Sequence, residues 1–326
     1  MSSFRTTMEK VFGSIPGLRK EMVTTLAKLD KANFDLIVVD EAHRLRKFKN
    51  LGNYGGRFKA VSHSLGLVPS TTNEMEWVLL KSKKAVLFYD SFQSIKPSDI
   101  DDEQFTVLKS SSNTKVIRLK EQLRSQGGTQ FSEFLERMFS NKLMPKEKFL
   151  LPVQSEFEFT YFDSIHEIRS EILKRDEEVG LSRLIAGFSW EWKTKNRDSV
   201  VEYDIEIDGL RFKWNTDKPD WINYEGSHLE VGCIHKTQGY DLNYCGIIFG
   251  KEIDYDWDQH QFTFDKNEYK DVNGKNGVKS DERLLNYLLN IYKTCILRGI
   301  KGCYIFSVNP GMKKFLKEHL ISFTSK

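Results

Sequence analysis

Short apolar runs alternate with helix-like patterns along most of this 326-residue chain. Residues 36–39 (LIVV) are entirely apolar and too few for a helix, so they predict a strand buried on both faces of a parallel sheet. Residues 85–89 (AVLFY) predict a second buried strand. Ahead of the first strand, one helical face carries four apolar residues and predicts a helix: Leu18, Met22, Leu26 and Leu29.

The rest of the chain repeats this alternation. Ser164 and Glu167 form a capping box, which predicts the start of a helix. Two polar stretches, 196–228 and 254–279, predict irregular insertions. Further helices are expected at 131–139 and 284–295, and further short strands at 116–119, 159–162, 184–188, 230–234, 245–249 and 302–307.

Strands that alternate with helices predict an α/β fold with two mostly parallel sheets. A chain of 326 residues exceeds what one compact core usually holds, so two domains are expected. We place the boundary near residue 125, which divides the chain into 1–125 and 126–326.

Composition describes an ordinary globular protein, with 39% hydrophobic and 29% charged residues and a net charge of +3. Partners must therefore be inferred from local patches of charge. No stretch approaches the roughly 18 apolar residues that span a bilayer, and the N-terminus lacks the apolar core of a secretory signal. The cysteines have no zinc-like spacing, which favours buried thiols in a reducing compartment and a cytoplasmic location: Cys233, Cys245, Cys295 and Cys303.

Two adjacent carboxylates, Asp40 and Glu41, follow the first predicted strand. Ligands of open α/β sheets bind outside the carboxyl ends of the strands. In nucleoside triphosphate hydrolysis one such acid can hold Mg²⁺ and the other can polarise the attacking water. The competing interpretation is a strand that ends in solvated acids. A phosphate-binding G-x-x-x-x-G-K-[ST] occurs nowhere in the chain.

Four later segments carry candidate chemistry. Gln93 follows the second strand, although a plain turn explains that position equally well. Arg124, two residues after Gln122, and Arg298, just before Gly299, offer guanidinium groups that match phosphate geometry. A surface arginine and a helix C-terminal cation are the respective structural alternatives. The polar segment 235–241 (HKTQGYD) follows a strand, as a ligand-approaching loop or a β-turn would.

These five segments, in this order, resemble motifs II to VI of superfamily 1 helicases, and in particular the bacterial Schlafen-group-3-like DNA/RNA helicase domains. The resemblance is carried by 34–46 (FDLIVVDEAHRLR), 86–100, 119–128 (LKEQLRSQGG), 230–250 and 292–306 (YKTCILRGIKGCYIF). It implies two RecA-like parallel-sheet domains of the P-loop NTPase fold, the first incomplete at its N-terminus. ATP and Mg²⁺ would bind between them, and single-stranded DNA or RNA would bind across the top.

The resemblance also implies roles for individual residues. Asp40 would hold Mg²⁺ through water, and Glu41 would activate the attacking water. Arg124 and Arg298 would reach the γ-phosphate as arginine fingers. The other residues implied to contact the nucleotide are Gln93, Gln122, Gln238 and Gly239. The chain departs from the family pattern at three positions: Lys236, Asp241 and Leu297.

The expected function is a superfamily 1 helicase-like ATPase module acting on DNA or RNA. Without a phosphate loop, the chain alone is expected to hydrolyse ATP negligibly. Its beginning resembles an internal point of a longer protein, and a partner chain that supplies the loop is the other possibility. The alternative is a non-catalytic nucleic-acid-binding or protein-interaction module that uses basic clusters: Arg44, Arg46, Lys47 and Lys49, with Lys81, Lys83 and Lys84.

Overall fold

The computed structural model describes residues 2–90, 97–119, 124–152, 154–195, 202–216, 218, 221–237, 240–275, 278 and 280–324. The chain divides into two compact units. The large unit contains residues 1–4, 120–271 and 291–326, and the small unit contains residues 5–119 and 272–290. Each unit is described by itself below, and the domain boundary near residue 125 stays a prediction.

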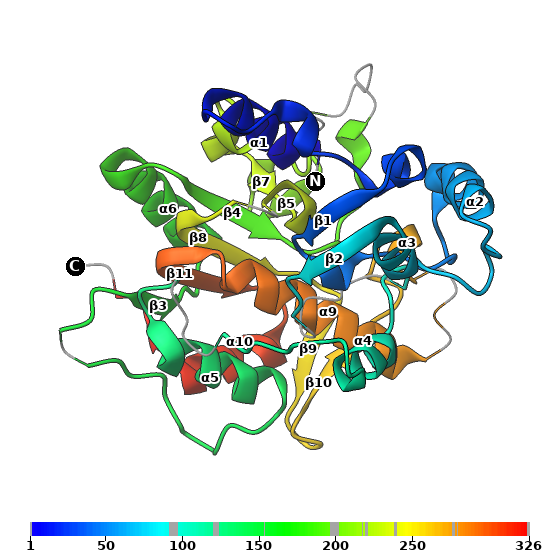
Figure 1. Cartoon of the computed structure of the whole chain (residues 1–326). Helices are drawn as coiled ribbons and strands as arrows, with labels where there is room; N and C mark the ends of the chain where they lie inside the picture. The colour runs from blue at the N-terminus through cyan, green and yellow to red at the C-terminus, as the bar shows by residue number, and fades with distance from the viewer. Residues whose placement is uncertain are drawn as a thin grey trace. The chain divides into compact units, whose positions relative to one another are not determined.

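A six-stranded parallel sheet forms the large unit, which confirms the mixed α/β class (Figure 1). Its long central strands are the apolar runs that the sequence marked as strands. In spatial order the strands are β12 (Ile321–Ser322), β3 (Glu158–Tyr161), β11 (Gly299–Ser307), β8 (Leu242–Phe249), β4 (Ser182–Ala186) and β7 (Val231–Gly232). The predicted strand 230–234 is therefore shorter than expected, because Ile234 begins the helix α7 (Ile234–Thr237).

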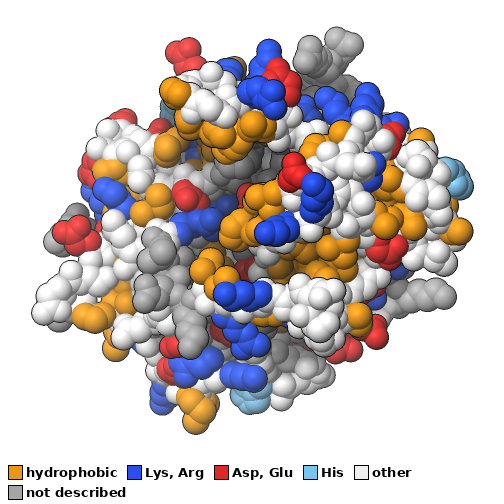
Figure 2. All heavy atoms as spheres, viewed as in Figure 1, with side chains coloured by type: hydrophobic (Ala, Val, Ile, Leu, Met, Phe, Trp, Pro, Cys, Tyr) orange, Lys and Arg blue, Asp and Glu red, His pale blue; other side chains and the backbone are white. Residues whose placement is uncertain are grey.

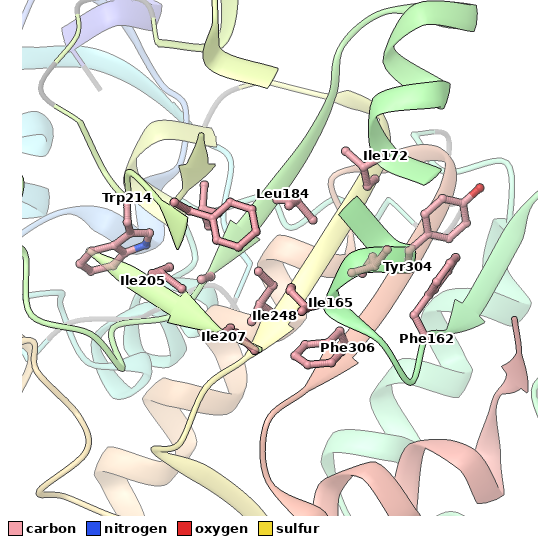
Figure 3. Close-up of a cluster of buried hydrophobic side chains, with 14 of the residues drawn as sticks. Phe162, Ile165, Ile172, Leu184, Ile205, Ile207, Trp214, Ile248, Tyr304 and Phe306 are labelled. Atoms are coloured by element: carbon pink, nitrogen blue, oxygen red, sulfur yellow. The ribbon is translucent and has the colours of Figure 1, made fainter. Parts of the chain in front are cut away.

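One face of this sheet packs against the helix α6 (Ile165–Val179). Ser164 caps the helix by accepting a hydrogen bond from the His166 backbone N–H at 3.2 Å, so the predicted helix start is confirmed. Ile165 and Ile172 of this helix meet Ile248 of β8 in a buried cluster (Figure 3). The helical period of α6 and the alternation of side chains along β8 thus direct apolar residues of both elements into one core.

The opposite face of the sheet packs against the last residues of the helix α9 (Asp281–Ile296). The ring of Tyr292 stacks on Phe249 of β8, with 4.3 Å between ring centroids. All four cysteines are buried and free, as the sequence predicted. Burial raises the pKa of the Cys295 and Cys303 thiols, which keeps both protonated and unreactive.

The first polar insertion is more ordered than expected. Its residues form the hairpin β5 (Ile205–Ile207) and β6 (Leu210–Phe212), followed by two short 3₁₀ turns. Trp214 is 1% exposed and joins the cluster of α6, next to Ile205 (Figure 3). The prediction of an irregular insertion was wrong here, because a few apolar residues among many polar ones were enough to fold it onto the core.

The second polar insertion also contains a hairpin, β9 (Ile253–Asp256) with β10 (Gln261–Phe264). This hairpin packs against the helix α10 (Pro310–His319), where Tyr255 lies 4.4 Å from Phe315 between ring centroids. Asp254 Oδ1 accepts a hydrogen bond from the Met312 backbone N–H at 2.6 Å, in the first turn of that helix. The hairpin is therefore anchored by both packing and a capping bond.

A two-stranded parallel sheet lies in the small unit, made of β1 (Phe34–Val39) and β2 (Ser82–Leu87). Both strands were predicted, but β1 is not buried on both faces. Leu36 and Val38 are 53% and 58% exposed, whereas Val39 is buried. The core below contains Phe58 and Trp77, from the helices α2 (Gly55–Ser64) and α3 (Glu74–Lys81).

Two predictions in the small unit were wrong. In place of one helix before β1, the chain forms two 3₁₀ turns, η1 (Lys20–Met22) and η2 (Leu26–Lys31). Only Leu29 of the apolar stripe is buried, so no continuous face was available to stabilise an α-helix. Residues 116–119 form no strand, and Ile117 and Leu119 are 73% and 84% exposed.

The remaining helices connect these parts. They are α1 (Ser2–Ser14), η3 (Ala42–Arg44), η4 (Gly52–Tyr54), α4 (Asp102–Ser110), α5 (Gly128–Phe139), η6 (Lys193–Lys195), η7 (Trp221–Asn223), η8 (Ser227–Leu229) and α8 (Val272–Lys275). Of these, α5 matches the predicted helix at 131–139. In the part of the chain that the structure describes, each helix is too short or too polar to cross a membrane.

Candidate functional site

The acidic pair stands in a tight turn at the carboxyl end of β1. Glu41 has φ +57°, in the left-handed region that non-glycine residues rarely adopt. Its backbone N–H donates to Asp40 Oδ1 at 3.0 Å. The turn is also bound to the end of β2, because Phe88 N–H donates to Val39 O at 2.9 Å and Ala42 N–H donates to Phe88 O at 2.7 Å. Asp40 is exposed at the end of the strand, whereas the side chain of Glu41 is only 14% exposed.

His43, one residue beyond Ala42, lies behind the acidic pair. Its side chain is only 4% exposed, and its Nε2 is 2.9 Å from Oε2 of Glu41. On the other side of the ring, Nδ1 accepts a hydrogen bond from the Asp90 backbone N–H at 3.3 Å. The imidazole therefore contacts both the acidic turn and the backbone of Asp90, which follows β2 in the chain.

The basic residues after the turn are held by acids of the same unit. Arg44 Nε lies 3.6 Å from Asp99 Oδ2, and Lys47 Nζ lies 2.5 Å from Asp101 Oδ2. Burial lowers the pKa of the Arg44 guanidinium, while Asp99 and Glu41 act in the opposite direction. These charges are engaged within the small unit, which leaves less of this cluster for an external phosphate backbone.

Arg46 is engaged as well. Its guanidinium lies 4.6 Å from the ring centroid of Tyr54, whose hydroxyl donates to Glu74 Oε1 at 2.7 Å. Glu74 Oε2 also accepts the Arg46 backbone N–H at 2.8 Å. Burial raises the pKa of the Glu74 carboxyl, and its bonds to Tyr54 and Arg46 oppose that shift. The nearby Phe58 is buried.

In the large unit, the structure brings together the segments that carry the two candidate arginines. Arg124 Nε lies 2.7 Å from Asp241 Oδ1, in a half-exposed ion pair. Two residues on, Gln126 N–H donates to Ile300 O at 2.8 Å, near the start of β11. The Arg124 segment is therefore attached at the amino edge of the sheet, beside the strand that follows Arg298.

Arg298 itself is 2% exposed. Its backbone carbonyl accepts the Leu242 N–H at 2.9 Å, which fixes it beside the residue that follows Asp241. Five residues earlier, the Lys293 ammonium forms an ion pair with Glu136 of α5. The segments of three predicted motifs thus meet at one edge of one sheet, although Arg298 is buried there.

Of the predicted site residues, four lie in the part of the chain that the structure describes and four do not. Asp40, Glu41, Arg124 and Arg298 are described above. The other four lie outside the described residues: Gln93, Gln122, Gln238 and Gly239. Sequence reasoning assigned no role to His43, although its spacing of two residues from Glu41 was a usable signal. Nor did it pair Asp241 with Arg124, and no local pattern links those two positions.

Asp40 is the residue that the sequence analysis predicts to hold Mg²⁺. Among the residues that the structure describes, no group of three or more His, Cys, Asp or Glu side chains could hold a metal ion. Mg²⁺ usually takes one or two protein carboxylates, with waters and substrate phosphates as its other ligands. The exposed carboxylate of Asp40 at a strand end fits that mode of binding.

A separate polar cavity of about 370 Å³ opens near the carboxyl ends of β8 and β11. It contains none of the predicted site residues. Its lining residues are Lys251, Asp254, Thr263, Phe264, Asp265, Glu268 and Asn309.

Comparison with known proteins gives two matches. The family described as Schlafen group 3, DNA/RNA helicase domain, matches residues 6–309. The chain is also 22% identical over 338 residues to the uncharacterized protein YPL245W of Saccharomyces cerevisiae, with 96% of this chain and 69% of that protein covered. The family match spans both units and every candidate residue above.

Proposed function

The chain belongs to the Schlafen group 3 DNA/RNA helicase domain family, and on that premise we propose that it is a superfamily 1 helicase-like ATPase module acting on DNA or RNA. The observation that carries the proposal is the acidic turn at the end of β1, inside the matched range. The six-stranded parallel sheet is compatible with a RecA-like domain, and we propose that both units are domains of the P-loop NTPase type.

The proposed chemistry divides between the units. Bound Mg²⁺ would neutralise phosphate charge, and Asp40 would hold it through water. Glu41 orients and polarises the attacking water. Arg124 and Arg298 stabilise charge on the transferred phosphoryl group. We assign the remaining nucleotide contacts to the other residues of the family motifs: Gln93, Gln122, Gln238 and Gly239.

Both arginines must change partners for this to happen. Arg124 pairs with Asp241 at an exposed position, so the pair is weak and exchange for a phosphate has a low cost. Arg298 is buried, and its guanidinium must become accessible when nucleotide binds. Both requirements follow from the proposal, and substitutions of Arg124 and Arg298 can test them.

Hydrolysis also needs a phosphate loop, and this sequence contains no G-x-x-x-x-G-K-[ST]. We propose that the chain alone turns over ATP negligibly, and that a further segment or a partner chain supplies the loop. One face of the β1–β2 sheet supports this idea, because parallel sheets are normally covered on both faces. The exposed face consists of Leu36 (53% exposed), Val38 (58%), Val86 (42%) and Phe88 (50%).

Figure 2 shows hydrophobic side chains at the surface over β1 and β2, with Lys or Arg side chains among them. A helix that follows the loop would cover this apolar face, and the loop would place phosphate-binding amides beside Asp40. The area that would be removed from water is apolar, so burial would favour docking.

The alternative function is a nucleic-acid-binding module with no ATPase role. It depends on free basic clusters, but Arg44 and Lys47 are paired with acids and Arg46 lies over Tyr54. Lys83 retains an exposed pair with Asp35, which solvent weakens. The structure therefore favours the catalytic proposal over the pure binder.

The test is titration with a fluorescent ATP analogue and Mg²⁺, with and without a single-stranded oligonucleotide. Weak or absent binding is expected for the chain alone. Addition of a phosphate-loop segment is expected to restore binding and hydrolysis, and Glu41→Gln should then abolish hydrolysis alone. Arg298→Ala should weaken nucleotide binding, while the exposed Arg19→Ala is the matched control.

Two results would contradict the proposal. A turnover above about 1 s⁻¹ by the chain alone would show that no further loop is needed. Oligonucleotide binding that responds neither to nucleotide nor to the Glu41 and Arg298 variants, with the loop segment present, would favour the pure binder.

A further inference from the structure

A row of lysines lies on the surface of the large unit, along α10 and the loop 140–150 that follows α5. Lys314 and Lys317 are one turn apart on the exposed face of α10. The loop adds three more exposed lysines, Lys142, Lys146 and Lys148. We call these five lysines the basic strip. The opposite face of α10 is buried in the unit and consists of Met312, Phe315, Leu316 and His319.

Hydrogen bonds hold the loop against the end of α10. The Lys146 backbone N–H donates to Glu318 Oε1 at 2.8 Å, and the Lys148 ammonium donates to Leu320 O at 3.5 Å. In Figure 2, Lys and Arg side chains gather in the lower part of the view, where Figure 1 draws α5 and α10. The lysines of the loop and those of α10 therefore meet on one surface of one unit.

The loop has a defined backbone. Lys146 has φ +60°, in the left-handed region that is unfavourable for a residue with a side chain. Such a conformation persists only where the surroundings enforce it, and the bond to Glu318 contributes to that. Glu147 closes the loop, because its Oε2 accepts the Met144 N–H at 3.0 Å and its carboxylate forms an ion pair with Arg137 of α5. The loop thus presents its lysines from an ordered scaffold.

Most lysines of the strip keep an uncompensated charge. Of the nearby acids, Glu147 is paired with Arg137, and Asp163 is paired with Lys317 at 2.7 Å. Glu318 has no ion pair in the part of the chain that the structure describes. The same holds for four lysines of the strip: Lys142, Lys146, Lys148 and Lys314. The surface is therefore positive and attracts a polyanion.

We propose that the basic strip binds the phosphate backbone of DNA or RNA, at a surface apart from the segments that carry the family motifs. This role rests on the proposed function, since it adds a second contact for the nucleic acid on which the module would act. Lysines that neutralise phosphates release counterions, and this term supplies most of the sequence-independent affinity for nucleic acid. The basic clusters of the small unit are engaged with acids and a tyrosine ring, whereas most of the strip is free for this task.

The strip offers charge without recognition of bases. Lys314 lies over the ring of Trp257, with 4.0 Å between the ammonium and the ring centroid, and Tyr161 near Lys317 is buried. Single-stranded bases stack on exposed aromatic rings, and neither ring is open for that purpose. Phosphate contacts carry no sequence information. We therefore expect the strip to bind different sequences alike, and DNA as well as RNA.

The first experiment measures binding of a fluorescently labelled oligothymidylate to the full chain, without nucleotide, at KCl concentrations from about 50 to about 200 mM. The test variant combines Lys142→Gln, Lys146→Gln and Lys314→Gln. Each lost phosphate contact lowers the salt slope by about 0.7, so the slope should fall by about 2 and Kd at low salt should rise about tenfold or more. Urea unfolding checks that the variant keeps the stability of wild type.

The matched control removes the same number of exposed lysines elsewhere on the large unit: Lys174→Gln, Lys193→Gln and Lys218→Gln. Its Kd should rise by less than about threefold, because charges far from the bound strand are screened. Equal losses in the two triple variants would contradict the proposal. A preference above about tenfold between oligothymidylate and oligouridylate, lost in the test variant, would also contradict it.

Acetylation by an amine-reactive reagent, followed by mass spectrometry, locates the contact. Bound oligonucleotide should protect Lys142, Lys146 and Lys314, whereas Lys174 should react as in the free chain. Equal labelling with and without oligonucleotide would overturn the proposal. Protection by phosphatidylserine vesicles or by polyglutamate, but not by the oligonucleotide, would assign the strip to a membrane or to an acidic protein and would overturn it as well.

These measurements are independent of ATP, so they separate the two proposals. If the test variant binds like wild type while the chain with a phosphate-loop segment hydrolyses ATP through Glu41, the role of the strip fails and the proposed function stands. If binding needs the strip but the supplemented chain does not hydrolyse ATP, the proposed function fails and the phosphate contact of the strip stands.

Discussion

A buried carboxyl group in the large unit makes its stability depend on pH. Glu252 is 0% exposed, and its Oε1 accepts a hydrogen bond from the Tyr292 hydroxyl at 2.5 Å. Burial raises the pKa of Glu252 above its ordinary value of 4.5, and bonds with Ser189 and Tyr292 only partly oppose the shift. The folded protein therefore keeps this proton at pH values where the unfolded chain has released it.

The sign follows from this difference in proton binding. Below the ordinary value of 4.5 both states hold the proton, and the stabilising contribution of neutral Glu252 is complete. As pH rises toward the raised folded pKa, only the unfolded chain releases it, so the free energy of unfolding falls. One proton corresponds to about 1.4 kcal/mol per pH unit inside this window.

The test compares wild type with Glu252→Gln, which keeps a similar shape but cannot ionise. The two should have similar stability below the ordinary pKa, and the variant should gain about 1.4 kcal/mol on wild type for each pH unit above it, up to the folded pKa. Urea unfolding followed by tryptophan fluorescence suits this unit. It contains five of the six tryptophans: Trp190, Trp192, Trp214, Trp221 and Trp257.

Two further variants complete the design. Glu225→Gln alters an exposed carboxyl and should leave the pH dependence as in wild type. Tyr292→Phe removes the hydroxyl donor, which should raise the pKa of Glu252 further and extend the window to higher pH. The reasoning would be refuted if the free energies of unfolding of wild type and Glu252→Gln changed in parallel from about pH 4.5 to about pH 8.

The other predictions concern packing and capping, and urea unfolding measures each of them. Ile248→Ala empties part of the core and should cost about 3 kcal/mol, against less than about 0.5 kcal/mol for the half-exposed Ile321→Ala. Equal losses would mean that this core is not close-packed. Asn73→Ala removes the side-chain oxygen that accepts two backbone N–H groups at the start of α3, at a cost of about 1 kcal/mol. No change would mean that water replaces the cap. Gly232→Ala places a methyl group 2.7 Å from a buried tryptophan ring and should cost about 1–3 kcal/mol, whereas Gly13→Ala meets open space and should be neutral or stabilising. A tolerated Gly232→Ala would show that the ring moves easily.

Elements set by local patterns were predictable. The run that became β1, the capped start of α6 and the helix α5 each depend on residues within a few positions. Prediction failed where an element needs a distant partner. Residues 116–119 have strand-like composition, yet the described structure offers them no pairing, and a strand without a partner has no ladder to join.

The candidate site divides in the same way. Asp40 and Glu41 could be placed at a strand end because the strand and the acids are adjacent in sequence. The contact of His43 with Asp90 and the pair of Arg124 with Asp241 join residues far apart along the chain. No periodicity reports such contacts, since they arise only when separate strands are brought to one edge.

Sequence alone determined the α/β class, the acidic turn, the order of the family motifs and the burial of the cysteines, because each depends on residue type and on spacing along one element. Tertiary structure decided that one face of β1 is exposed, that Trp214 of a polar insertion belongs to the core, and that Arg298 is buried. The physical reason is that burial is a property of surfaces packed together. The chemistry of a side chain limits the environments in which it is stable, and packing against the rest of the fold determines which of those environments it has.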